Sequence, residues 1–164
     1  MPKLIVIRGN SGSGKSSAAA AVQKHFGRGC LRIPQDTVRR DMLLGKDTEA
    51  LPLLETLVRF AHENCEIAVL EGILAAEVYA PLFQLINELY GKDVHAFYYD
   101  IPFEETLRRH DTRPQKTQFG EEAMRDWWIE KDYSPLLHET PITQEMSLEE
   151  AVELIVRSAE EKKS

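Results

Sequence analysis

The chain has 164 residues, of which 20 are Lys or Arg and 27 are Asp or Glu, so its formal charge is −7. That length predicts one domain spanning residues 1–164. A hydrophobic fraction of 43% with 29% charged residues is typical of a globular protein and excludes a disordered acidic chain. The negative charge argues against general binding to nucleic acids or anionic membranes, although a local basic patch is compatible with it.

Other features of the sequence concern its compartment. No stretch approaches eighteen consecutive apolar residues, so we expect no membrane span. The first residues, MPKLIVIRGN, have the pattern of a strand and not of a signal peptide. Cys30 and Cys65 form no CxxC motif and suggest no disulfide framework, which favours a cytoplasmic protein. Nothing in the sequence indicates an oligomeric state.

Short apolar runs alternate with longer amphipathic stretches. The Leu/Ile/Val run at 4–7 is typical of a strand buried on both faces. This alternation predicts a parallel sheet covered by helices. In chain order, we expect a strand at 4–7, a helix at 16–26, a strand at 30–33, helices at 36–44 and 51–64, a strand at 67–70, a helix at 82–90, a strand at 96–99, a helix from 102 through 107, a basic turn-rich segment at 108–120, a helix from 121 to about 131, a weak strand at 141–144 and a helix at 148–158.

Residues 9–16 match GxxxxGK[ST], the P-loop pattern, between a predicted strand and a predicted helix. Glycines allow a tight turn that aims successive N–H groups inward, and the helix N-terminus adds a positive dipole. Lys15 can neutralise the β- and γ-phosphates of ATP, and the Ser16 hydroxyl can bind Mg²⁺. The alternative is a Gly/Ser turn with a solvated lysine. The pattern predicts ATP binding by Gly9, Asn10, Ser11, Gly12, Ser13, Gly14, Lys15, Ser16 and Ser17.

A P-loop alone does not separate kinases from other nucleotide-binding proteins. The chain lacks an NKxD tetrapeptide, which disfavours a guanine-nucleotide switch, and an LSGGQ-like signature, which disfavours a transporter ATPase. It is also too short for the additional elements that motor proteins usually contain. A small phosphotransferase fits best, and it needs a base and anion-binding groups near its acceptor.

Three stretches resemble the small P-loop kinases, which include polynucleotide 5′-kinase domains, chloramphenicol phosphotransferase and zeta toxins. They are IVIRGNSGSGKSS, RIPQDTVRRDML and FYYDIPFEETLRRHDTR, and together they span most of residues 4–113. The resemblance implies an α/β, three-layer P-loop NTPase fold with a parallel five-stranded sheet covered by helices. It also implies a basic lid at about 108–125, with ATP and Mg²⁺ as the nucleotide and its metal ion.

In these kinases an Asp after the second strand accepts the proton of the acceptor hydroxyl, and an Arg one helical turn later binds the acceptor. The resemblance assigns these roles to Asp36 and Arg39. Ligands of parallel sheets bind beyond the carboxyl ends of strands, where Asp36 would lie. The alternative is that Asp36 only caps its helix and forms a surface pair with Arg39. We expect Arg40 to be a solvated helix residue.

Glu71 and Asp100 each follow an apolar strand. P-loop enzymes often place a Walker B carboxylate at such a strand end, although the usual residue is Asp. Glu71 would therefore reach Mg²⁺ through water, contact the acceptor, or be a strand-end carboxylate without chemistry. For Asp100 we expect a role in capping the helix that begins at Pro102.

Basic residues are dense between the predicted helices at 102–107 and 121–131. In the family this position is a mobile lid whose arginines close over the ATP phosphates, a role suited to planar guanidinium donors. Arg109 and Arg113 are the preferred pair, and a solvated basic loop is the alternative. We expect His110 to pack or to be solvated. The basic residues are Arg108, Arg109, His110, Arg113 and Lys116.

The helix predicted from 121 to about 131 contains Arg125, Trp127 and Trp128. Two adjacent tryptophans cannot both face one side of a helix, so we expect one in the core. The other could line the acceptor pocket, and Arg125 could join the lid.

We therefore expect an ATP-dependent kinase that moves the γ-phosphoryl group to a hydroxyl of a small molecule, such as a nucleoside, sugar, nucleotide sugar or antibiotic. A polynucleotide 5′-hydroxyl kinase is one alternative, but the acidic total does not favour the basic groove that it would need. A nucleotide-gated regulatory module with low turnover is another. The residues expected to act are Lys15, Asp36, Arg109 and Arg113 in catalysis, Asp36, Arg39 and Glu71 in acceptor binding, and Ser16 at the metal.

Overall fold

A computed structural model of the chain describes residues 1–113 and 119–161. Within these residues, the strands form one parallel sheet in the order β2-β3-β1-β4-β5. The predicted five-stranded parallel sheet is therefore confirmed. The strands are β1 (Lys3–Gly9), β2 (Leu31–Pro34), β3 (Ile67–Gly72), β4 (Val94–Tyr99) and β5 (Thr140–Ile142).

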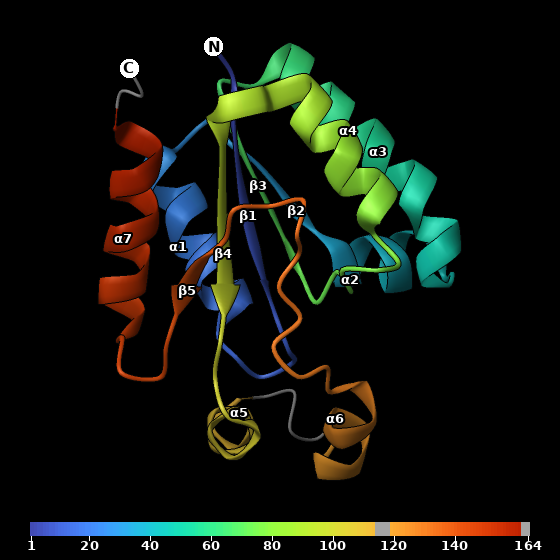
Figure 1. Cartoon of the computed structure of the whole chain (residues 1–164), viewed down its shortest axis with the longest axis vertical. Helices are drawn as coiled ribbons and strands as arrows, with labels where there is room; N and C mark the ends of the chain where they lie inside the picture. The colour runs from blue at the N-terminus through green and yellow to red at the C-terminus, as the bar shows by residue number, and fades with distance from the viewer. Residues whose placement is uncertain (114–118, 162–164) are drawn as a thin grey trace.

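Helices cover both faces of the sheet (Figure 1). Helices α1 (Lys15–Phe26) and α7 (Leu148–Glu160) lie on one face, and α3 (Asp47–Asn64) and α4 (Ala80–Tyr90) lie on the other. Strand β1 contributes Leu4 and Val6 to the core on the α3–α4 side, and Ile5 and Ile7 to the core on the α1–α7 side. Both faces of β1 are buried, which explains its unbroken apolar run. No described helix is long and apolar enough to cross a membrane.

Helices α5 (Phe103–Asp111) and α6 (Glu121–Trp127) lie beyond the carboxyl end of β4 (Figure 1). The prediction of a turn-rich segment from residue 108 is wrong for its first residues, because α5 continues to Asp111. The predicted helix to about residue 131 ends at Trp127 instead. The backbone of Ile129 is bound by the Asn10 side chain, whose Nδ2 donates to Ile129 O at 2.7 Å and whose Oδ1 accepts from Ile129 N at 2.8 Å. These bonds replace the helical ones.

The predicted helix at 36–44 is divided into two parts. A short α-helix, α2 (Gln35–Thr37), continues into a π-helical stretch, η1 (Val38–Leu43), which ends where Leu44 adopts a positive φ of 56°. Single π-helical turns occur frequently at functional sites. A 3₁₀ turn, η2 (Gly91–Asp93), precedes β4.

The side chain of Arg8, at the end of β1, is fully buried. Its Nε and Nη2 donate to Leu74 O at 3.1 and 2.9 Å, and its Nη2 also lies 2.9 Å from Asp132 Oδ2. Its Nη1 donates to both carboxylate oxygens of Glu139, at 3.1 and 2.9 Å. Arg8 therefore joins the loop after β3 to the segment that precedes β5. No local sequence pattern indicates these contacts, because the partners are 66 to 131 residues away.

Replacing Arg8 with methionine should destabilise the fold by about 3–5 kcal/mol, because the Glu139 carboxylate and much of Asp132 would remain buried without a counter-charge. Urea unfolding measures this difference. Arg157→Met is the control: Arg157 forms an exposed i,i+4 pair with Glu153, and its loss should cost less than about 1 kcal/mol. Similar changes in the two variants would contradict a structural role for the buried pair.

Candidate active site

The P-loop connects β1 to α1 and folds as a glycine turn. Gly12 and Gly14 have φ values of 81° and 113°, which L side chains rarely adopt. A Cβ at Gly12 would also lie 2.7 Å from the carbonyl oxygen of Thr106 on α5. The loop is thus closely packed against α5, and Gly14 forms the N-terminal cap of α1.

Lys15 is buried in this loop, and its Nζ donates to Asn10 O at 2.9 Å. Burial lowers the pKa of Lys15 to about 8, although the nearby Glu71 carboxylate acts in the opposite direction. A buried ammonium that donates to one carbonyl among the described residues is suited to an anionic ligand.

Glu71, at the end of β3, faces the P-loop. Its Oε1 accepts a hydrogen bond of 3.3 Å from Ser16 Oγ, and the residue is buried. Burial raises the pKa of Glu71, while Lys15 and the Ser16 hydrogen bond oppose this shift. Within residues 1–113 and 119–161, no group of three or more His, Cys, Asp or Glu side chains could hold a metal. The paired oxygens of Ser16 and Glu71 fit Mg²⁺ that receives its other ligands from phosphates and water.

Two clefts flank the P-loop. The first, the α5–α7 cleft, is lined by Gly14, Ser17, Tyr99, Arg108, Arg109, Arg113 and Ser147, among others. The second, the α2 cleft, has a volume of about 550 Å³ and is lined by Ser11, Gly12, Lys15, Ser16, Gln35, Asp36, Arg39, Arg40, Asp47, Glu71, Arg113 and Trp127, among others. Arg113 lines both clefts, so they adjoin at this side chain.

Asp36 lies on α2 with its carboxylate at the α2 cleft. Arg39 Nη2 and Arg40 Nε approach its Oδ1 at 3.2 and 3.1 Å. The predicted surface pair with Arg39 is therefore present, but Asp36 is not the N-cap, which is Pro34. Arg40 is exposed, as expected for a solvated helix residue, and its guanidinium also lies 5.4 Å from the Trp127 ring centroid. The structure thus places Asp36, Arg39 and Glu71 along one cleft.

Arg109 and Arg113 lie beside the P-loop. A Cβ at Gly14 would be 3.4 Å from Arg109 Nη1 and 4.0 Å from Arg113 Nη2. Arg109 Nη1 donates to Ser13 O, and its Nε donates to Glu105 Oε1 at 3.0 Å. Burial and the neighbouring Arg109 lower the pKa of Arg113, which forms no ion pair with the described carboxylates. Lys116, the remaining basic residue of the predicted lid, lies outside the described residues.

Comparisons with known proteins agree with this geometry. Residues 1–42 match the zeta toxin family. The structure is similar to the APS kinase of Mycobacterium tuberculosis, solved in complex with AMPPNP and APS, with a TM-score of 0.67 and 21% identity over 98% of both chains. A gluconokinase from Sinorhizobium meliloti 1021 has a TM-score of 0.63 and 19% identity over 96% of this chain and 89% of its own. The chain has the fold of the small P-loop kinases.

A further match to this kinase fold is a chain of the Pnkp1/Rnl/Hen1 RNA repair complex. It has a TM-score of 0.58 and 20% identity over 76% of this chain and 42% of its own. No curated protein sequence matches the chain significantly. The resemblance to small P-loop kinases that the sequence indicated is confirmed.

Several predictions about the outer residues of this kinase fold are corrected. Asp100 does not cap the helix after Pro102; it accepts hydrogen bonds from Lys131 Nζ at 3.0 and 2.9 Å and from Tyr133 OH at 2.9 Å. Neither tryptophan is in the core. Trp127 lines the α2 cleft, whereas Trp128 packs edge-to-face on Phe103.

Two further side chains beside the clefts differ in their surroundings. Arg125 is exposed, pairs with Glu121 at 3.2 Å and lies over Phe103, so it lines neither cleft. His110 is buried and stacks on Phe119, as the packing expectation predicted.

Gln35 was not predicted from the sequence, although it precedes Asp36. It is buried, and its Nε2 donates to Asp47 Oδ1 and Tyr79 OH at 3.1 and 2.9 Å. Tyr79 is 44 residues away in the sequence, so no local pattern indicates this contact. Its position directly after a strand and before Asp36 is the one signal that could have drawn attention to it.

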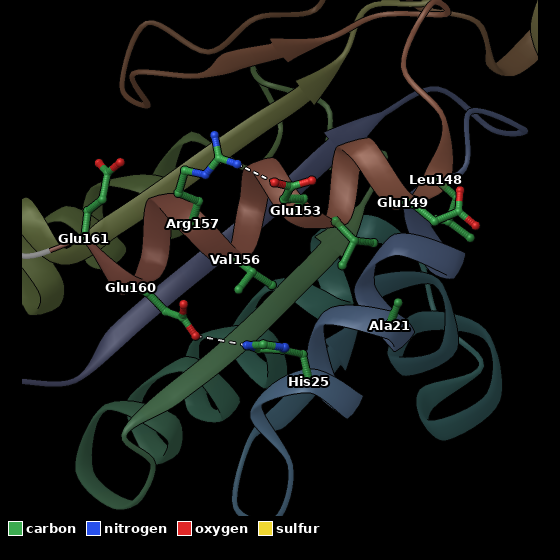
Figure 2. A pocket seen from close by; sticks show the side chains of 10 residues that line it. Ala21, His25, Leu148, Glu149, Glu153, Val156, Arg157, Glu160 and Glu161 are labelled. Atoms are coloured by element: carbon green, nitrogen blue, oxygen red, sulfur yellow. Dashed lines mark hydrogen bonds and ion pairs between the residues drawn. The ribbon is translucent and has the colours of Figure 1, made fainter.

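A third hollow lies between α1 and α7 and runs along α7 from Leu148 to Glu161 (Figure 2). Ala21, Leu148 and Val156 form part of its apolar floor, and a 3.0 Å contact between His25 Nε2 and Glu160 Oε1 crosses it. No P-loop residue lines this groove. The phosphate-binding elements are therefore gathered at the two clefts.

The low pKa of Lys15 predicts a pH dependence of nucleotide binding. A triphosphate stabilises the protonated ammonium, and free Lys15 loses its proton above a pKa of about 8. The affinity for AMPPNP should therefore fall as pH rises, towards roughly tenfold per pH unit above pH 8. Calorimetric titration between pH 6.5 and 9.5 measures it. Lys15→Ala should abolish binding, and a flat affinity profile for the unaltered chain would contradict the assignment.

Proposed function

We propose that the chain transfers the γ-phosphoryl group of ATP to a hydroxyl of a small molecule, with Mg²⁺. The observation that supports this function best is that two clefts adjoin at the P-loop and share Arg113. A phosphoryl transfer needs a donor and an acceptor on either side of one phosphorus atom. The α5–α7 cleft would hold the nucleotide, and the α2 cleft would hold the acceptor.

The donor is bound by the glycine turn, whose N–H groups and helix dipole favour phosphate oxygens. Lys15 provides a buried positive charge beside them. Ser16 and Glu71 would hold Mg²⁺, which neutralises charge on the phosphates when it is bound. Arg109 is held in place beside Gly14 by Glu105 and by the Ser13 carbonyl.

The acceptor is activated by Asp36. As the hydroxyl oxygen forms its bond to the γ-phosphorus, its proton passes to an oxygen of the Asp36 carboxylate. The bond between the γ-phosphorus and the β–γ bridging oxygen breaks, and ADP leaves. Arg39 and Arg40 orient the carboxylate through their contacts to Oδ1. Arg113, which has no carboxylate partner among the described residues, would stabilise charge on the transferred group.

A small acceptor is favoured over a polynucleotide end. The α2 cleft holds about 550 Å³, and the chain has a net charge of −7. A polynucleotide needs an extended basic surface for its phosphates. The RNA repair complex with the same fold makes a 5′-hydroxyl oligonucleotide a necessary member of any acceptor panel. A nucleotide-gated module would bind AMPPNP without transferring phosphate.

Asp36→Asn should lower kcat by about 10²–10⁴-fold, because the amide cannot accept the hydroxyl proton. The affinity for AMPPNP should change less than about twofold, since Asp36 lies on the acceptor side. Transfer of ³²P from labelled ATP and a nucleotide titration measure the two quantities. Asp41→Asn, an exposed change in the same π-helical stretch, is the matched control and should leave kcat unchanged. Full turnover in Asp36→Asn would contradict the role of base.

Arg113→Gln should lower kcat by about 10²–10³-fold, with a smaller effect on nucleotide affinity, because its charge is needed most in the transition state. Arg125→Gln on α6 is the comparison. The Arg125 side chain is 64% exposed, pairs with Glu121 and lines neither cleft, so its loss should have little effect. Steady-state kinetics on both variants measures this difference. Equal losses of kcat in the two variants would contradict the role of Arg113 in the transition state.

A further inference from the structure

The orientation of the Gln35 amide is set by its neighbours. Its Nε2 donates to both Asp47 Oδ1 and Tyr79 OH, while the Tyr79 hydroxyl donates to Asp47 Oδ1 at 2.7 Å. Rotating the amide by half a turn would place its oxygen against the Asp47 carboxylate, and two acceptors repel each other. The amide orientation is therefore fixed, with Nε2 facing Asp47 and Tyr79.

The Gln35 oxygen, Oε1, is left as an open acceptor on the wall of the α2 cleft. It lies close to Gly72, where a Cβ would approach it to 2.9 Å, and both residues line the cleft. It accepts no hydrogen bond from any described residue, and it is not enclosed away from solvent. A ligand that donates an O–H or N–H group would satisfy it.

The positive charges on the acceptor side are already balanced. Arg39 contacts Asp36 at 3.2 Å and Asp47 at 3.7 Å, and Arg40 contacts Asp36 at 3.1 Å. A negative group here would compete with two carboxylates for the same guanidinium groups and would repel Asp36. Arg113, which has no carboxylate partner in the described part of the chain, lies beside Gly14 of the P-loop, where the transferred phosphoryl group would be.

Apolar side chains complete the same wall. Ile73 and Leu74 follow β3, Ile129 comes from the segment after α6, and all three line the α2 cleft. Such surfaces favour the uncharged parts of a ligand over ionic ones.

We propose that the acceptor has no negative charge and donates a second hydrogen bond to Gln35 Oε1, besides the one from its reacting hydroxyl to Asp36. This inference rests on the proposed phosphoryl transfer. It selects neutral or cationic molecules with several donors, such as sugars, nucleosides and hydroxylated antibiotics. It excludes nucleotide sugars, sugar acids and polynucleotide ends. Gln35 thereby helps to determine which acceptor molecules bind.

The charge of the acceptor can be tested without knowing its identity. A bacterial small-molecule extract is separated by anion exchange into unretained and retained fractions, and each is incubated with the chain and [γ-³²P]ATP. A 5′-hydroxyl oligonucleotide is assayed separately. Labelled product should arise from the unretained fraction only. Product from the retained fraction or the oligonucleotide overturns this inference but keeps phosphoryl transfer. Product from none of the three, with AMPPNP still bound, overturns both.

The role of Gln35 is tested on the unretained fraction. Gln35→Met should raise the concentration of fraction that gives half-maximal labelling by about tenfold, with AMPPNP affinity unchanged, which also shows that the variant folds. If Gln35→Met does not fold, Gln35→Asn replaces it in the same measurement. Its side chain is one methylene shorter, so its amide oxygen is withdrawn from the cleft.

The matched control is Gln23→Met on α1. It removes an equivalent amide, whose Nε2 donates to Cys30 O at 2.9 Å and which lines neither cleft. It should leave the half-maximal concentration unchanged. Unchanged values in both Gln35 variants would overturn the role of Gln35.

Discussion

The shape of the α2 cleft depends on the buried guanidinium of Arg8. This residue directly precedes the P-loop, yet its hydrogen bonds reach Leu74, Asp132 and Glu139 in two distant segments. The donors of a guanidinium have a fixed planar geometry, so one side chain sets the positions of both segments relative to β1. Leu74 itself lines the α2 cleft, and so does Ile129, three residues before Asp132. Strand β1, which ends in the P-loop, therefore also supports the part of the α2 cleft wall that Leu74 and Ile129 form.

Local charge, and not the net charge, governs the candidate site. The chain is acidic overall, but Lys15 and Arg113 are buried or half-buried beside the P-loop. The carboxylates of Glu71 and Asp36 line the same cleft. In such surroundings burial and neighbouring charges both shift pKa values. Burial lowers the pKa of Lys15, and the Glu71 carboxylate partly reverses this shift. A single triphosphate suits this arrangement, because it meets concentrated positive charge without needing a basic surface.

Local patterns predicted the sheet, the P-loop and the grouping of Asp36, Arg39 and Glu71 along one cleft, because these depend on strand ends that a parallel sheet brings to one edge. They failed where a distant side chain decides the backbone. The helix at Trp127 stops because Asn10 binds Ile129, although the residues that follow are compatible with a helix. Asp100 likewise binds Lys131 and Tyr133, more than 30 residues away, and does not cap the helix that follows it. Neither partner can be recognised from sequence spacing.

The sequence by itself determined the phosphate cradle, because glycines with positive φ, a buried strand and a following helix form it locally. It also placed a carboxylate and arginines near that cradle. Only the tertiary structure decided what surrounds them. The orientation of the Gln35 amide comes from Asp47 and Tyr79, and the pairing of Arg40 with Trp127 comes from a helix far along the chain. The wall of the α2 cleft depends on such contacts between distant residues, since it is formed only when the chain folds and brings them together.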